Sequence, residues 1–161
     1  MNKLITSIIL IIIFLIAYLL QSNFFAWFTI AGVKPNLFVL LVIIIGLFSG
    51  KTTGTIFGVT FGILIDIYVA EIIGPSGIML GAIGYLGGYL DKNFSKDSKL
   101  TIIIIIAIAT IVFESALYLF KSFYSGMDVQ MTLFLKILGI EVVYNMLLTI
   151  MLYPILLKRG I

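Results

Sequence analysis

The chain has 161 residues, of which 62% are hydrophobic and 11% charged, whereas a soluble domain usually carries about 25% charged residues. Its mean hydropathy of +1.28 excludes an ordinary water-soluble fold, because a domain of this size leaves much of its surface in water, and predicts an integral membrane protein. Cysteine and histidine are absent and the net charge is only +3, which excludes disulfides, zinc sites built on those residues, histidine-based catalytic triads and a basic nucleic-acid-binding face.

Six apolar segments along the chain predict six transmembrane helices. A helix needs about 20 mostly apolar residues to cross a hydrocarbon core of roughly 30 Å. The first segment follows Lys3, as in a signal peptide, but it is long and no small-residue cleavage site follows it, so we expect an uncleaved anchor. In chain order, the expected spans are residues 4–22, 35–49, 52–70, 75–90, 100–120 and 133–157.

Polar residues, glycines and prolines separate these spans. The most polar stretch is the loop DKNFSKDSK at residues 91–99, and Glu71 with the Gly74-Pro75 pair divides the third span from the fourth. No long linker or polar appendage interrupts the pattern, so residues 1–161 are interpreted as a single membrane domain. The predicted fold class is an all-α integral membrane protein.

The distribution of lysine and arginine predicts that both ends of the chain lie in the cytoplasm. With the N-terminus inside, the cytoplasmic segments carry seven basic residues and the outer segments carry three. Basic residues accumulate in short cytoplasmic loops, so this asymmetry favours an even number of spans. The seven are Lys3, Lys51, Lys92, Lys96, Lys99, Lys158 and Arg159, and the three are Lys34, Lys121 and Lys136.

Glycines recur at intervals of four residues in the third span, and a similar pattern follows in the fourth. Small residues at this spacing lie near one helix face and let another backbone approach closely. Glycine is common in membrane helices, but this regular spacing favours close packing of the two helices. Whether the surface that contacts the glycines belongs to this chain or to another protein stays open. The residues concerned are Gly50, Gly54, Gly58, Gly62 and Asp66, then Gly77, Gly81, Gly84 and Gly88.

Three acidic residues, Asp66, Glu114 and Glu141, lie within the predicted spans. A carboxylate at membrane depth is costly, so it normally faces a bundle interior, a wet cavity or a partner. At a rise of about 1.5 Å per residue, all three fall in one layer in the outer half of the membrane. This candidate polar cluster is a structural network, a docking surface, or a small-molecule or ion site. A structural network would draw on Lys34, Lys121, Lys136, Tyr118, Tyr144 and Asn145.

The order of the spans and the glycine-rich segment from Gly54 to Leu90 resemble the MreD family of rod shape-determining proteins. In that family a glycine-rich third span ends in Leu-x-Asp, and a second glycine-rich span follows a short loop. Here Leu64-Ile65-Asp66 and Gly74-Pro75-Ser76-Gly77 stand in those places. Lys34-Pro35-Asn36 opens the second span, although aspartate is expected in many relatives where this chain has Asn36.

The resemblance implies a non-enzymatic subunit of the bacterial elongation machinery in the inner membrane. Its implied partners are the bitopic protein MreC and, indirectly, the actin-like MreB, a SEDS glycosyltransferase and a penicillin-binding transpeptidase. It also implies a six-helix fold similar to the S components of energy-coupling-factor transporters, so the alternative function is a vitamin-type small-molecule-binding subunit. The compact outer loops favour the scaffold. Without a nucleophile motif, a metal cluster or a phosphate loop, we expect no catalytic residue, cofactor or metal.

Overall fold

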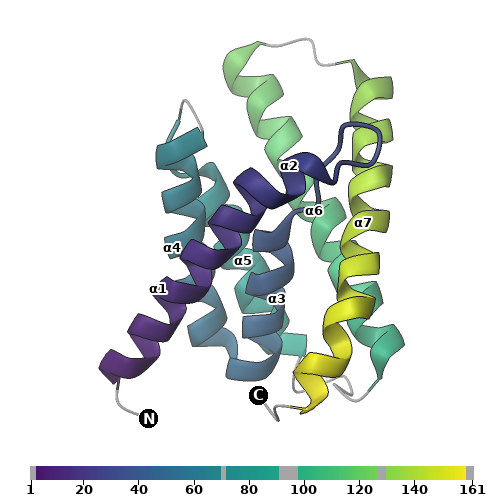
Figure 1. Ribbon diagram of the computed structural model, residues 1–161. Helices are drawn as coiled ribbons and strands as arrows, with labels where there is room; N and C mark the ends of the chain where they lie inside the picture. The colour runs from purple at the N-terminus through teal and green to yellow at the C-terminus, as the bar shows by residue number, and fades with distance from the viewer. Residues whose placement is uncertain (1–2, 70–71, 91–97, 127–129, 159–161) are drawn as a thin grey trace.

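A computed structural model of the protein describes residues 3–69, 72–90, 98–126 and 130–158. Over these residues the chain is mostly helical, and six long helices pass back and forth through one bundle (Figure 1). The predicted all-helical architecture with six long helices is therefore confirmed. The helices are α1 (Lys3–Leu19), α3 (Leu37–Ser49), α4 (Lys51–Val69), α5 (Pro75–Leu90), α6 (Lys99–Ser125) and α7 (Met131–Lys158).

Two helices in the described part of the chain are clearly long and apolar enough to cross a membrane. They cover Lys99–Tyr124 of α6 and Met131–Leu152 of α7. Shorter apolar helical segments cover Ile11–Trp27 and Leu37–Ser49. The first of these continues past α1, because a π-helical turn, η1 (Leu20–Phe24), and the short α2 (Phe25–Trp27) extend the helix. These lengths agree with a protein that lies in a membrane.

Helix α6 is longer than the predicted span of residues 100–120. It begins at Lys99 because the Ser98 side chain caps it, accepting the N–H of Thr101 at 3.4 Å. It continues to Ser125 and ends where Gly126 adopts a left-handed conformation with φ of 57°. Such a glycine is a common stop signal after a helix.

The central helix, α3, is the most buried. It lies between the α4–α5 pair and the α6–α7 pair (Figure 1), and Val39, Leu40 and Val42 are fully buried. Its 13 residues rise only about 20 Å, which is short of the roughly 30 Å hydrocarbon core. Residues 28–36, which precede α3, are not helical.

The chain enters the bundle before α3 begins. Ile30 and Val33 exchange two backbone hydrogen bonds of 3.1 and 2.9 Å around a tight turn at Ala31 and Gly32, whose φ angles are 50° and 81°. Val33 and Pro35 are then buried, so the segment that precedes α3 lies partly inside the protein. Helix α3 consequently starts within the bundle.

Helix α1 crosses the α3–α4 face at a slant (Figure 1). It is anchored by aromatic contacts, with the Phe14 ring centroid 5.6 Å from that of Phe38 on α3 and 4.7 Å from that of Phe61 on α4. The described isoleucines on its other faces are exposed, as expected for residues that face lipid. Helix α1 begins and α7 ends at the same end of the bundle (Figure 1), as an even number of passes requires.

Candidate functional site

The glycines of α4 face the backbone of α5. A Cβ atom added at Gly58 would overlap the carbonyl group of Leu80, and one added at Gly62 would overlap the backbone at Gly77. The reverse holds at Gly84, where an added Cβ would overlap the carbonyl group of Gly54. Only a residue without a Cβ fits at such places, so the backbones of these two helices are in direct contact.

Two of the predicted positions on α5 meet side chains rather than backbone. A Cβ added at Gly77 would lie 2.9 Å from Ile63 Cγ1, and one added at Gly81 would lie 2.6 Å from Val59 Cγ2. The end of a flexible side chain moves aside more easily than a backbone atom does. These two positions therefore restrict the residue type less strictly than Gly58 or the positions that face backbone.

The close contact continues onto α3 through two glycines that the spacing argument missed. An added Cβ at Gly46 would overlap the Gly84 carbonyl oxygen, and one at Gly87 would lie 2.8 Å from the carbonyl oxygen of Ile43. Gly46 precedes Gly50 by four residues, so extending the repeat one step towards the N-terminus would have found it. The glycine contact thus joins three helices, α3, α4 and α5.

Gly50 has a different role from the other glycines in the series. Its φ is +89° and nothing lies within 4 Å of a Cβ built on it, so the turn between α3 and α4, rather than helix packing, requires glycine there. Gly88 on α5 packs against this turn, because its added Cβ would overlap the backbone of Gly50 and Lys51. The glycine surface is thus occupied by helices of the chain itself.

Asp66 caps the N-terminus of α5. Its Oδ2 accepts the backbone N–H of Gly74 at 2.8 Å and that of Ser76 at 3.0 Å, and the side chain is almost completely buried. The first N–H groups of a helix lack partners within the helix, and a carboxylate also complements the positive end of the helix dipole. Asp66 therefore fixes the connection between α4 and α5 at the end of their glycine contact.

A buried polar network joins the start of α3 to α6 and α7. The backbone N–H of Asn36 donates to Asn145 Oδ1 at 2.9 Å, and Asn36 Nδ2 donates to Glu114 Oε1 at 3.0 Å. Asn145 Nδ2 donates in turn to Thr110 Oγ1 at 2.9 Å. Polar groups inside a membrane protein need internal partners, so these bonds determine where α3 begins.

Gln21, in the π-helical turn η1 that follows α1, bonds to the same place. Its Nε2 donates to the carbonyl oxygen of Pro35 at 2.8 Å, and its Oε1 accepts the N–H of Leu37 at 3.0 Å. Asn36 completes the start of the helix, because its Oδ1 accepts the N–H of Val39 at 3.3 Å. Sequence reasoning missed this role of Gln21 and Asn36, although an isolated amide beside an apolar span is the signal that points to it.

Glu114 and Glu141 lie together, while Asp66 belongs to a separate set of hydrogen bonds. Glu141 faces both the Glu114 carboxyl group and the Asn36 side chain, and its Oε1 is buried without a hydrogen-bond partner. The lysines expected to satisfy the acids, Lys34, Lys121 and Lys136, are exposed. Within the described residues, no ion pair joins any of them to either glutamate. Of the tyrosines expected there, the Tyr144 hydroxyl donates to the Phe28 carbonyl oxygen.

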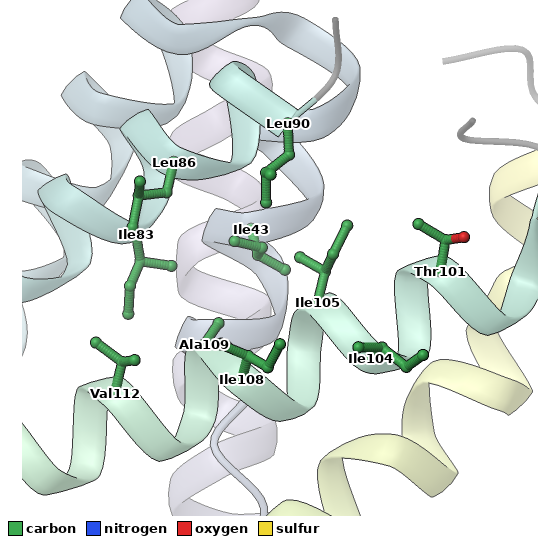
Figure 2. A pocket seen from close by; sticks show the side chains of 10 residues that line it. All are labelled: Ile43, Ile83, Leu86, Leu90, Thr101, Ile104, Ile105, Ile108, Ala109 and Val112. Carbon is green, nitrogen blue, oxygen red and sulfur yellow. The ribbon is translucent and has the colours of Figure 1, made fainter. Parts of the chain in front are cut away.

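An apolar groove of about 380 Å³ lies between α3, α5 and α6. Figure 2 shows side chains of α5 and α6 facing each other across it, with Ile43 of α3 at its base. Thr101 contributes the single hydroxyl among the lining residues, which are Ile43, Ile83, Leu86, Leu90, Thr101, Ile104, Ile105, Ile108, Ala109 and Val112. Several of these side chains are about half exposed, so the groove opens onto the membrane-facing surface.

A second cavity, of about 350 Å³, lies near the start of α3 and has a mixed lining. Its volume is within the range of small-molecule sites. The lining combines a cation, amide and hydroxyl groups and apolar side chains, namely Tyr18, Gln21, Ser22, Lys34, Asn36, Phe38, Ile65 and Phe113. Asn36 belongs both to this cavity and to the polar network.

The family model for rod shape-determining protein MreD matches residues 1–158. The chain belongs to the MreD family. No curated protein and no solved structure gives a significant match. Members of this family are non-enzymatic membrane proteins that determine rod shape, so the protein has a role in cell shape. The resemblance recognised in the sequence is thereby confirmed over nearly the whole chain.

Proposed function

We propose that the protein is a scaffold subunit of the bacterial elongation machinery that binds the transmembrane helix of MreC in the groove between α3, α5 and α6. Through MreC it helps to organise MreB, a SEDS glycosyltransferase and a penicillin-binding transpeptidase during lateral-wall synthesis. The observation that carries the proposal is the groove itself, which is apolar and has partly exposed walls on α5 and α6.

The groove suits a single apolar helix for two reasons. Its exposed walls are branched aliphatic side chains such as Ile104 and Ile108, and dispersion contacts between such surfaces contribute to helix association in lipid. One wall and the base belong to α5 and α3, which the glycine contacts hold rigidly against each other and against α4. A preformed surface costs a partner less conformational entropy when it binds.

In the proposed orientation, both chain ends and the polar loop at residues 91–99 are cytoplasmic in the inner membrane. The basic residues support it, with seven on the proposed inner side against three on the outer side. Helix α1 begins and α7 ends at the same end of the bundle (Figure 1), which also supports this orientation. Leu90 and Thr101, at one end of the groove, then lie near the cytoplasm.

Disulfide crosslinking tests the groove directly, because the chain has no cysteine of its own. Ile108→Cys places a thiol in the groove, and Leu147→Cys places one on an exposed part of α7. Both residues lie about 15 Å from the ends of their helices at Lys99 and Lys158, so membrane depth is matched. With single cysteines along the MreC membrane helix, oxidation in native membranes is expected to crosslink Ile108→Cys and not Leu147→Cys. Equal yields, or crosslinks at Leu147→Cys alone, would contradict the assignment.

The second candidate function is that of a small-molecule-binding subunit resembling an energy-coupling-factor S component. The mixed cavity beside Lys34 and Asn36 favours it, because it offers polar groups and apolar surface together in the proposed outer half. Thermal unfolding of the purified protein with and without a vitamin panel tests this alternative. A rise of several degrees with one compound would support a ligand site, and no rise with any would favour the scaffold alone.

A further inference from the structure

The Glu114–Glu141 pair lies where two negative charges are hardest to accommodate. The two carboxyl groups face each other between α6 and α7, and Glu141 is only 6% exposed. Carboxylates that share a site cannot both ionise without strong mutual repulsion, and the low dielectric of a membrane protein increases that cost.

Among the residues that the structure describes, no lysine or arginine pairs with either glutamate. Lys34 on the loop before α3, Lys121 on α6 and Lys136 on α7 are exposed, and no ion pair joins any of them to either glutamate in the described part of the chain. The groups that face Glu141 are the Glu114 carboxyl group and the Asn36 side chain. Tyr118 lies one turn beyond Glu114 on α6, and Tyr144 lies about one turn beyond Glu141 on α7.

The hydrogen bonds at this site stabilise one negative charge, on Glu114, but not a second one on Glu141. Asn36 Nδ2 donates to Glu114 Oε1 at 3.0 Å, and the N-terminal end of α3 adds a positive dipole at the same place. Glu141 Oε1 is buried and has no donor, although an unsatisfied polar atom at membrane depth is costly. A hydrogen bond between two carboxyl groups requires a proton on one of them.

We propose that Glu114 and Glu141 form a binding site for one proton, which bridges α6 and α7 beside the start of α3. With the proton bound, Glu141 donates to Glu114, and the remaining charge lies on Glu114 where Asn36 and the α3 dipole stabilise it. Asn36 also lines the mixed cavity of about 350 Å³, which gives the proton a polar route to the site. Loss of the proton leaves two facing carboxylates and drives α6 and α7 apart, so the site couples pH to the position of α7.

Labelling with dicyclohexylcarbodiimide tests whether a proton is present, because this apolar reagent reacts with protonated carboxyl groups inside membranes. The purified full chain in detergent is treated at pH 6, 7, 8 and 9, and adducts are located by mass spectrometry of peptides. Adducts on Glu114 or Glu141 are expected at pH 6 and are expected to decrease as the pH rises to 9. Absence of an adduct on both residues at every pH would overturn the proposal.

Thermal unfolding provides a second readout with matched variants. Because the folded protein holds a proton that the unfolded chain releases, the midpoint of the wild type is expected to fall by about 3 °C or more between pH 6 and pH 9. Glu141→Gln keeps the shape of the protonated side chain and is expected to lose this pH dependence, while Asp97→Asn, in the polar loop, is expected to retain it. Equal pH dependence in Glu141→Gln and the wild type would overturn the proposal.

A sodium arm distinguishes a proton from a metal cation. Adduct yield and unfolding midpoint are compared at fixed pH in sodium chloride and in choline chloride. A proton site predicts no difference between the two salts. If sodium protects the glutamates from labelling and raises the midpoint at pH 9, the site holds a metal ion and the proton assignment is wrong.

Discussion

Replacing Gly58 by alanine measures how strongly the fold depends on the α4–α5 contact. The added Cβ would overlap the carbonyl group of Leu80, which is backbone and cannot rotate away, so the two helices must separate locally. Overpacking of this kind typically costs about 1–3 kcal/mol. Alanine is also the better helix former, by about 0.8–1 kcal/mol in a helix interior. Because the clash is with backbone, we take the overpacking cost from the upper end of its range. After the gain in helix propensity is subtracted, the expected net loss of folding free energy is about 1–2 kcal/mol.

The assay is thermal unfolding of the purified protein in detergent, with two comparison variants. About 1–2 kcal/mol corresponds to a fall in the midpoint of about 2–8 °C for a chain of this size. Gly139 on α7 has nothing within 4 Å of a built Cβ, so Gly139→Ala is expected to leave the midpoint unchanged or to raise it slightly. Gly81→Ala is expected to fall between the two, because the Val59 side chain can adopt another rotamer.

The order of the three variants carries the test. If Gly58→Ala and Gly139→Ala unfold at the same temperature, the backbones of α4 and α5 are not in contact and the reasoning from the glycines is refuted. A fall at all three positions would instead show that alanine is tolerated nowhere in these helices, and helix packing would not explain the effect.

Four further results are expected. Asp66→Ala leaves the N–H groups of Gly74 and Ser76 without their acceptor and is expected to cost about 1–3 kcal/mol and to impair rod shape in a depleted strain. Asp66→Asn keeps an acceptor oxygen, so its unfolding midpoint is expected to stay closer to that of the wild type. Ser95→Cys is expected to resist an impermeant thiol reagent in intact cells and to react once the membrane is opened, whereas labelling from outside would reverse the topology. Ala31→Gly relieves a φ of 50° and is expected to raise stability by up to about 1 kcal/mol, measured as a higher unfolding midpoint.

Much of the helical framework could be predicted because hydropathy and glycine spacing are local properties of a sequence. Apolar runs of sufficient length have few alternatives to helix in lipid, where every backbone group must be paired within the segment. The four-residue interval of Gly54, Gly58 and Gly62 places them near one face whatever the rest of the chain does. The interval did not specify the partner helix, because glycine on α3, on α5 or on another protein would satisfy it equally.

The polar contacts could not be predicted with the same success, because depth is only one coordinate of a residue in a bundle. Counting along the helices places Asp66, Glu114 and Glu141 at one height, but it does not give the direction in which each side chain points. Asp66 points to the start of α5, and the glutamates point to each other. The role of Asn36 was missed for a related reason, since a short helix that begins inside the bundle has no hydropathy signature of its own.

The two kinds of contact divide the protein into parts that respond differently to a perturbation. Lipid gives helices little hydrophobic reason to associate, so association depends on close packing and on interhelical hydrogen bonds. Helices α3, α4 and α5 use close packing along much of their length, whereas α6 and α7 are joined to the start of α3 through the Asn36, Glu114 and Asn145 bonds at one height. The apolar groove lies along the boundary between these parts, with α5 on one wall and α6 on the other. We therefore expect a change at the glutamate pair to alter the width of the groove before it disturbs the glycine contacts, and we expect a helix bound in the groove to respond to the state of the polar network.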